Sequence, residues 1–214
     1  MQKINFNDRY GLTQAVIEGR KTMTRRLINL ILKDCAAVHK NCWGADWSDK
    51  PMSLVVDRDT GGIYCKYCGN GVRLYDGEYH YKAKYKVGEV VAVAQSYNSF
   101  YDDTYNPTLF PAGAGWDNKM FVKAELMPYQ IRITGIKCER LQDISDAECL
   151  KEGMRVKFAR NGMPMYYYFD TKRWREVWFD TPREAFASLI DKVSGRGTWA
   201  SNPWVVVYEF ELVK

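Results

Sequence analysis

Residues 19–26, Gly-Arg-Lys-Thr-Met-Thr-Arg-Arg, constrain the fold of this chain more than any other stretch. They follow residues 7–18, in which apolar side chains recur at helical spacing and can share one face. Asn7 is a suitable N-cap for such a helix, and Gly19 stands where a helix ends in the left-handed conformation. The sequence therefore predicts a short helix that is followed directly by a strongly basic segment.

The basic segment alternates if it is extended, because successive side chains of a strand point to opposite faces. Lys21 and Arg25 then lie on one face, and Thr24 and Arg26 lie on the other. Cations are also common at helix C-termini, where the partial negative charge of the helix favours them. Solvated cations at a helix end are therefore the simpler interpretation, and a charged binding site is the alternative.

The same segment resembles the signature of ASCH-domain proteins, which form a PUA-like β-barrel. Further along the chain, residues 85–93 look like the family's Gly-Asp strand, and residues 131–154 look like its strand and helix. Residues 202–210 resemble the closing strand of the larger, phage-associated members. The resemblance implies an α+β fold, in which a PUA-like (ASCH) small β-barrel with flanking helices forms a single domain over residues 1–214.

Two sizeable insertions interrupt this pattern. Residues 33–84 lack the periodicity of a compact barrel and hold most of the cysteines. Residues 155–179 contain Asn161-Gly162 between two apolar runs, which is a strong hairpin signal. The aromatic residues 166–168 of this hairpin could stack on nucleic-acid bases while nearby cations hold phosphate. Packing between aromatic side chains on neighbouring strands explains the same residues more simply.

Two further helices are predicted by capping boxes, Ser145 with Glu148 and Thr181 with Glu184. Gly153 is expected to end the first of them. The second carries an apolar face that we assign to the core, and this face consists of Phe186, Leu189, Ile190 and Val193.

Six cysteines in a chain of this length, with no secretory leader expected, favour thiols or a metal site over disulfides. Cys65 and Cys68 are separated by two residues, a spacing that lets both thiolates reach one tetrahedral ion. His39 and Cys42 offer the best spacing for the other two ligands. A structural zinc would explain how this glycine-rich loop becomes ordered, and a metal-free hairpin is the alternative. No other cofactor is required.

The resemblance implies two functions of different classes. In the first, the protein binds RNA or a modified nucleobase in a cleft lined by residues 19–26, with cations on phosphate and an aromatic ring on the base. In the second, it is an amidohydrolase that deacylates N4-acylcytidine-type nucleosides, with Lys21, Thr24 and Glu152 as catalytic residues. For both functions the expected ligand-binding residues are Arg20, Arg25, Arg26, Gln95, Tyr97 and Trp204.

In the hydrolase, the threonine would attack the amide carbonyl, a lysine of lowered pKa would act as base, and the glutamate would orient the lysine. The alternative is that Lys21 and Glu152 form only an ion pair, with Thr24 hydrogen-bonded to the backbone. The chain also departs from the family at Ala94 and Gln95, where relatives commonly carry arginine and glutamate. Loss of that charged pair indicates a different ligand.

The net charge of +5, from 31 basic and 26 acidic residues, permits a nucleic-acid partner without requiring one. No apolar run approaches the roughly 20 residues of a membrane helix. We therefore expect a cytoplasmic protein without a membrane partner, and the sequence indicates no oligomeric state. A third interpretation is a phage accessory protein that acts through protein contacts of residues 33–84.

Overall fold

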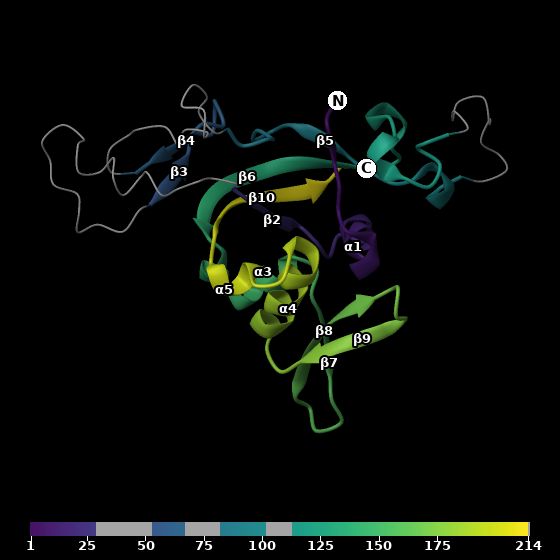
Figure 1. Cartoon of the computed structure of the whole chain (residues 1–214), viewed down its shortest axis with the longest axis vertical. Coiled ribbons are helices and arrows are strands. Elements are labelled where there is room, and N and C mark those ends of the chain that lie inside the picture. Colours follow the sequence, from purple (N-terminus) through teal and green to yellow (C-terminus); the bar gives the residue numbers. More distant parts are fainter. Residues whose placement is uncertain (29–52, 67–81, 102–112, 214) are drawn as a thin grey trace, which may run out of the picture.

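The computed structural model of the chain describes residues 1–28, 53–66, 82–101 and 113–213 (Figure 1). Its main element is a five-stranded sheet in the order β1-β5-β6-β10-β2. Strand β1 is parallel to β5, and the other neighbouring strands of the sheet are antiparallel. The five strands are β1 (Lys3–Ile4), β2 (Met23–Leu27), β5 (Val90–Val93), β6 (Gln130–Arg140) and β10 (Trp204–Leu212).

The long strands β6 and β10 curve together, and helices lie beneath their concave side in Figure 1. Gly135 of β6 lies opposite Glu209 of β10, and a Cβ atom at Gly135 would fall 3.4 Å from that of Glu209. The α-helices of the described residues are α1 (Leu12–Ile17), α3 (Asp146–Lys151), α4 (Pro182–Ser194) and α5 (Thr198–Ser201). The 3₁₀ turns are η1 (Asp8–Tyr10), η3 (Tyr97–Ser99), η4 (Lys119–Phe121), η5 (Ala124–Leu126) and η6 (Leu141–Asp143).

Two smaller sheets complete the described structure. Strands β3 (Leu54–Val56) and β4 (Ile63–Cys65) form a hairpin within the predicted insertion of residues 33–84. The predicted insertion of residues 155–179 forms a separate three-stranded antiparallel sheet. Its strands are β7 (Arg155–Phe158), β8 (Pro164–Asp170) and β9 (Arg175–Phe179).

The predicted α+β class is confirmed. The β-barrel that the family resemblance implies is not confirmed. Within the described residues, β1 and β2 are the two edges of the five-stranded sheet. None of the described helices is long and apolar enough to span a bilayer.

Local sequence signals are confirmed at three points. Both predicted capping boxes form, with Ser145 accepting from the Glu148 amide and Thr181 accepting from the Glu184 amide. Residues 161 and 162 form the predicted turn between β7 and β8. The predicted N-cap at Asn7 is wrong, because its side chain makes no cap hydrogen bond and Gly11 adopts a left-handed φ of 64°. This glycine divides the predicted helix into η1 and α1.

A continuous hydrophobic core joins the main sheet to the helices. The apolar face predicted for α4 contributes Phe186, Leu189 and Ile190, which are all buried, whereas Val193 of the same predicted face is 40% exposed. A smaller cluster forms around the end of β5 and includes Tyr97. The basic segment that follows α1 lies at the edge of the main core. Its charged side chains therefore lie beside buried apolar residues.

Candidate functional site

Gly19 directs the chain from α1 into the basic segment, with the left-handed φ of 71° that the sequence predicts. The segment then becomes the edge strand β2, in which Thr24 lies opposite Tyr208 and Arg25 lies opposite Val207 of β10. The Thr22 amide donates to the carbonyl of Lys151 at 2.9 Å. This contact places the C-terminal end of α3 beside the start of the basic segment.

Lys21 is buried at this junction, with a side chain that is 2% exposed. Its ammonium group donates to the Met23 carbonyl at 2.7 Å, to the Glu152 carbonyl at 2.9 Å and to Glu152 Oε2 at 2.5 Å. Burial lowers the pKa of Lys21, the Glu152 carboxylate opposes this effect, and the charges of Arg26 and Arg25 add to it. The predicted ion pair between Lys21 and Glu152 is confirmed.

Gly153 allows α3 to end at this point, as predicted. Its φ of 104° is strained for any residue with a side chain. A Cβ atom there would also lie 3.4 Å from Leu12 and 3.6 Å from the Cβ atom of Lys21. The glycine therefore sets the path by which the Glu152 carbonyl and carboxylate reach the lysine.

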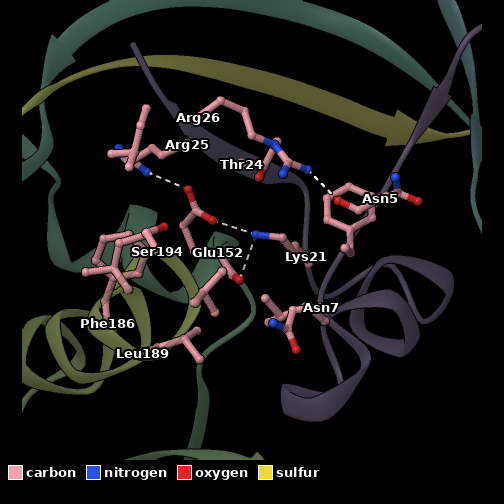
Figure 2. Close-up of a pocket in the computed structure, with 15 residues that line it drawn as sticks. Asn5, Asn7, Lys21, Thr24, Arg25, Arg26, Glu152, Phe186, Leu189 and Ser194 are labelled. Atoms are coloured by element: carbon pink, nitrogen blue, oxygen red, sulfur yellow. Dashed lines mark hydrogen bonds and ion pairs between the residues drawn. The ribbon is translucent and has the colours of Figure 1, made fainter. Parts of the chain in front are cut away.

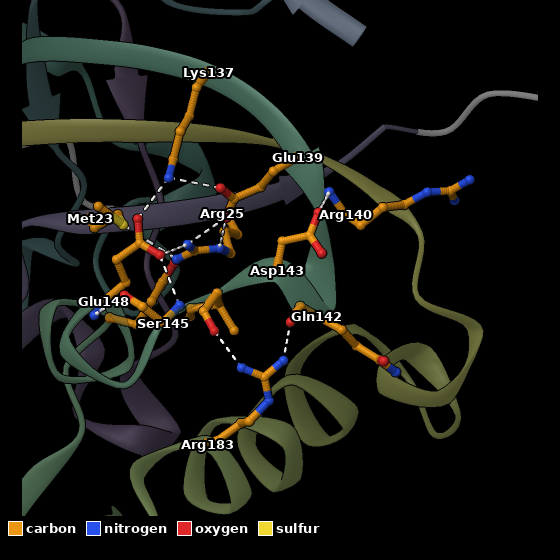
Figure 3. A network of polar contacts seen from close by, with 12 residues as sticks. Met23, Arg25, Lys137, Glu139, Arg140, Gln142, Asp143, Ser145, Glu148 and Arg183 are labelled. Carbon is orange, nitrogen blue, oxygen red and sulfur yellow. Dashed lines mark hydrogen bonds and ion pairs between the residues drawn. The ribbon is translucent and has the colours of Figure 1, made fainter. Parts of the chain in front are cut away.

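Arg25 is the centre of a buried polar network (Figure 3). Its guanidinium, 1% exposed, is 2.6 Å from Glu139 and 3.0 Å from Glu148. It is also 3.1 Å from Glu152 Oε1, so Glu152 bridges Arg25 and Lys21. Lys137 completes the network at 2.7 Å from both Glu139 and Glu148. Three cations and three carboxylates thus neutralise one another, which is the condition for burying charge at this density.

We expect the protein to unfold more readily in acid, because protonation of Glu148 weakens the polar network. Burial acts to raise the pKa of Glu148, but hydrogen bonds from Lys137 and the Ser145 amide, with the charge of Arg25, outweigh it and lower the pKa to about 2. The usual pKa of a glutamate is 4.5, so the stabilisation is fully present above that pH and is lost as the pH falls towards 2. Glu148→Gln should remove this acid-sensitive part, which is on the order of 2 kcal/mol.

The measurement is the free energy of urea unfolding of both proteins between about pH 5 and about pH 2. Glutamine at the N3 position retains the capping box with Ser145, so the variant changes the charge and keeps the cap. An equal loss of stability with acid in both proteins would mean that another group controls this pH range.

A pocket of about 250 Å³ lies between β2, the chain before α1, and α4 (Figure 2). The predicted catalytic residues Lys21, Thr24 and Glu152 all line it, together with Arg25 and Arg26. These residues form a polar floor, and the apolar face of α4 supplies one wall. The same face is therefore both core, as predicted, and pocket wall.

The Thr24 hydroxyl forms no hydrogen bond within the part of the chain that the structure describes, so the backbone hydrogen bond considered in the sequence analysis is not found there. Thr24 is nevertheless buried, on the pocket side of β2. Arg26 donates to the Asn5 carbonyl at 2.6 Å, across the pocket rim.

Four predicted ligand-binding residues lie elsewhere. Arg20 pairs with Glu18 at the end of α1, at 2.5 Å. Tyr97 is buried in the second cluster, where its hydroxyl accepts from the Lys123 amide. Gln95 does not line the pocket. Trp204 does not line it either, and the Arg140 guanidinium lies over the Trp204 ring, 4.8 Å from the ring centroid. The structure therefore does not bring these four side chains to the pocket.

Other lining residues were not predicted as site residues. These are residues before α1 and at the end of β2, which lack a motif, and residues at the start of α1 and on α4, where helical periodicity indicates only burial. They include Asn5, Phe6, Asn7, Leu12, Leu27, Phe186, Leu189, Ile190, Val193 and Ser194.

The predicted zinc ligands fall mostly outside the described residues. Cys65 is buried at the end of β4. His39, Cys42 and Cys68 lie outside the residues that the structure describes. Within the described ranges no group of three or more His, Cys, Asp or Glu side chains could hold a metal ion. The zinc site stays a prediction.

In comparisons with known proteins, the chain matches no family model, and no curated protein or solved structure is significantly similar to it. The interpretation of the pocket therefore depends on its own residues and geometry.

Proposed function

We propose that the pocket binds a nucleoside or nucleobase with an acyl group on an exocyclic nitrogen, as in N4-acylcytidine, and hydrolyses the amide bond. The observation that carries the proposal is the Thr24 hydroxyl, which lines the pocket beside the buried Lys21–Glu152 pair. A hydroxyl without a partner among the described residues is available to a ligand.

The charge distribution favours a small neutral ligand over a strand of RNA at this pocket. Every N–H group of Arg25 already has an acceptor, and the ammonium group of Lys21 has three. Neither residue has a donor left for a phosphate. A volume of about 250 Å³ suits one base with a small substituent and is too small for several nucleotides.

In the proposed reaction, Thr24 Oγ1 attacks the amide carbonyl carbon. The C–N bond breaks, so that the acyl group becomes an ester on Thr24 and the nucleoside leaves as the free amine. Lys21 carries the hydroxyl proton to the departing nitrogen. Water then cleaves the ester and releases the carboxylic acid. Lys21 must be neutral for this role. Its burial lowers its pKa and so favours that state, as do the charges of Arg26 and Arg25, whereas the Glu152 carboxylate opposes it.

The resemblance of residues 19–26 to the ASCH signature supports the same substrate class. Lys21 and Thr24 occupy matching positions in that signature, and Glu152 precedes the helix-ending glycine. As part of the proposal, the curved five-stranded sheet belongs to a PUA-like barrel, with the pocket between sheet and helices.

A second candidate is a module that binds RNA or a modified nucleobase in the same pocket without chemistry. It is favoured by the three acceptors around Lys21, since an ammonium group held in this way is well placed to remain charged. In this case the ion pair would shape the pocket, and Arg26 and the apolar wall would contact the base.

The deciding experiment is incubation of the purified protein with N4-acetylcytidine, followed by chromatographic measurement of cytidine and acetate. Release of both products in catalytic amounts, with retention of intact cytidine, is the expected result. No release at stoichiometric enzyme, together with saturable binding of N4-acetylcytidine in calorimetry, would overturn hydrolysis in favour of the binding module. Absence of both would overturn the assignment of the pocket.

A further inference from the structure

The β7–β8–β9 sheet has one covered face and one uncovered face. On the covered face, Tyr168 packs edge-on against Tyr10 at 5.6 Å, and its hydroxyl is hydrogen-bonded to Ser188 of α4. Because side chains alternate along a strand, Tyr167 and Phe169 of β8 project from the opposite face. Tyr167 is itself only 5% exposed, with the Trp178 ring and the Lys157 ammonium group beside it. Trp178 of β9 joins them there, since it is the direct partner of Tyr167.

Two pairs of aromatic rings lie on the uncovered face. The rings of Tyr167 and Trp178 are 4.4 Å apart, and those of Phe169 and Trp174 are 5.4 Å apart. Trp174, in the turn between β8 and β9, is 81% exposed, and Trp178 is also exposed. Exposed tryptophans of this kind provide faces on which planar groups can stack.

Trp174 also has a backbone conformation that is unusual for its residue type. Its φ is 50°, in the left-handed region that glycine or asparagine normally occupies in such a turn. A bulky residue in this region destabilises the fold, and an 81% exposed ring recovers little of that through packing. The fold therefore does not explain why tryptophan stands at this position.

The charge of the molecule is concentrated on the same sheet. Residues 155–179 hold six basic and two acidic residues, a net charge of +4, compared with +5 for the whole chain. The turn and the first residue of β9 read Lys172-Arg173-Trp174-Arg175, and all four residues are exposed. None of these three cations forms a salt bridge within the described residues. Lys157 lies over the rings of Tyr167 and Trp178, at 5.0 and 5.6 Å from their centroids.

We propose that this uncovered face, which we call the tryptophan face (Lys157, Tyr167, Phe169, Trp174, Trp178 and the turn cations), binds single-stranded nucleic acid. Bases stack on Trp174 and Trp178, and Lys172, Arg173 and Arg175 contact the phosphates on either side. An apolar protein partner would use the rings and leave the unpaired cations without a role. A polyanion whose bases have flat faces uses both.

The tryptophan face is independent of the proposed hydrolase pocket. No residue of 155–179 lines that pocket. Nucleic-acid binding here therefore stands or fails separately from the hydrolysis of nucleosides.

The experiment is fluorescence anisotropy of labelled single-stranded oligonucleotides, U20 and dT20, with the intact protein at about 50 mM salt, where phosphate contacts are strong. Trp174→Ala should weaken binding by about tenfold or more, because a stacked base is lost. Arg173→Gln should reduce the slope of log affinity against log salt by about 0.7, the contribution of one phosphate on a single strand. Comparison of U20 with dT20 separates RNA from DNA preference.

Two variants make the test specific to the face. Trp174→Gly relieves the left-handed strain, so the protein should unfold at the same or a higher temperature while binding is lost. Phe158→Ala removes a ring that is 73% exposed on the other face of the sheet, and it should leave binding unchanged. No oligonucleotide binding by the wild type, equal loss in Phe158→Ala, or binding only to anionic phospholipid vesicles would overturn the proposal.

Discussion

Thr24→Val is expected to reduce the rate of cytidine release from N4-acetylcytidine by about a thousandfold or more, as loss of a nucleophile does in other hydrolases. Valine has the shape and strand preference of threonine and lacks only the hydroxyl. Because no described residue bonds to that hydroxyl, its removal should not lower the free energy of unfolding. The diagnostic result is loss of turnover without loss of stability.

The measurement is a time course of cytidine release for each variant, with unfolding in urea measured on the same samples. Thr22→Val is the matched control, because Thr22 lies in the same basic segment and does not line the pocket. It should retain turnover. Full activity in Thr24→Val would remove the threonine from the mechanism, and water activated by Lys21 would have to replace it.

Arg25→Met should have the largest effect on stability, a loss of about 3–5 kcal/mol, because it leaves buried carboxylates without their shared cation. Glu139, Glu148 and Glu152 all contact this guanidinium. Methionine fills much of the same volume, so the loss reports charge more than packing. A typical domain has a free energy of unfolding of about 5–15 kcal/mol, and the variant would retain only part of it.

Urea unfolding at neutral pH measures this loss. Arg132→Met is the control, because Arg132 pairs with Glu211 on the same sheet with side chains that are 47% and 56% exposed. Screening by solvent makes an exposed pair worth about 1 kcal/mol or less. Similar losses for the two variants would mean that the Arg25 network contributes no more than a surface ion pair.

The sequence by itself determined the features that depend on neighbouring residues. The capping boxes at Ser145 and Thr181, the helix end at Gly19 and the Asn-Gly turn at residues 161–162 all form as predicted. Each depends on hydrogen bonds or backbone preferences within a few residues, so a local pattern is sufficient to predict it. Gly11 shows the limit of this approach, since a single left-handed residue divided the predicted first helix.

The sequence also placed Lys21, Thr24 and Glu152 in one site, through the family resemblance, and the structure brings these three residues to one pocket. It did not predict that Arg25 would be enclosed by three carboxylates. Cations of a basic segment look alike in sequence, and only their neighbours distinguish a solvated one from a buried one.

Tertiary structure made that distinction. Pairing of β2 with β10, and of β10 with β6, turns Arg25 towards Glu139, while α3 brings in Glu148 and Glu152. The apolar face of α4 becomes a pocket wall only because the helix faces β2 across the pocket. Tyr97 is buried in another cluster because the chain after β5 turns away from that pocket. Contacts between segments far apart in sequence determine which polar groups lose their water, and this decides which charges bind each other and which hydroxyl is left for a ligand.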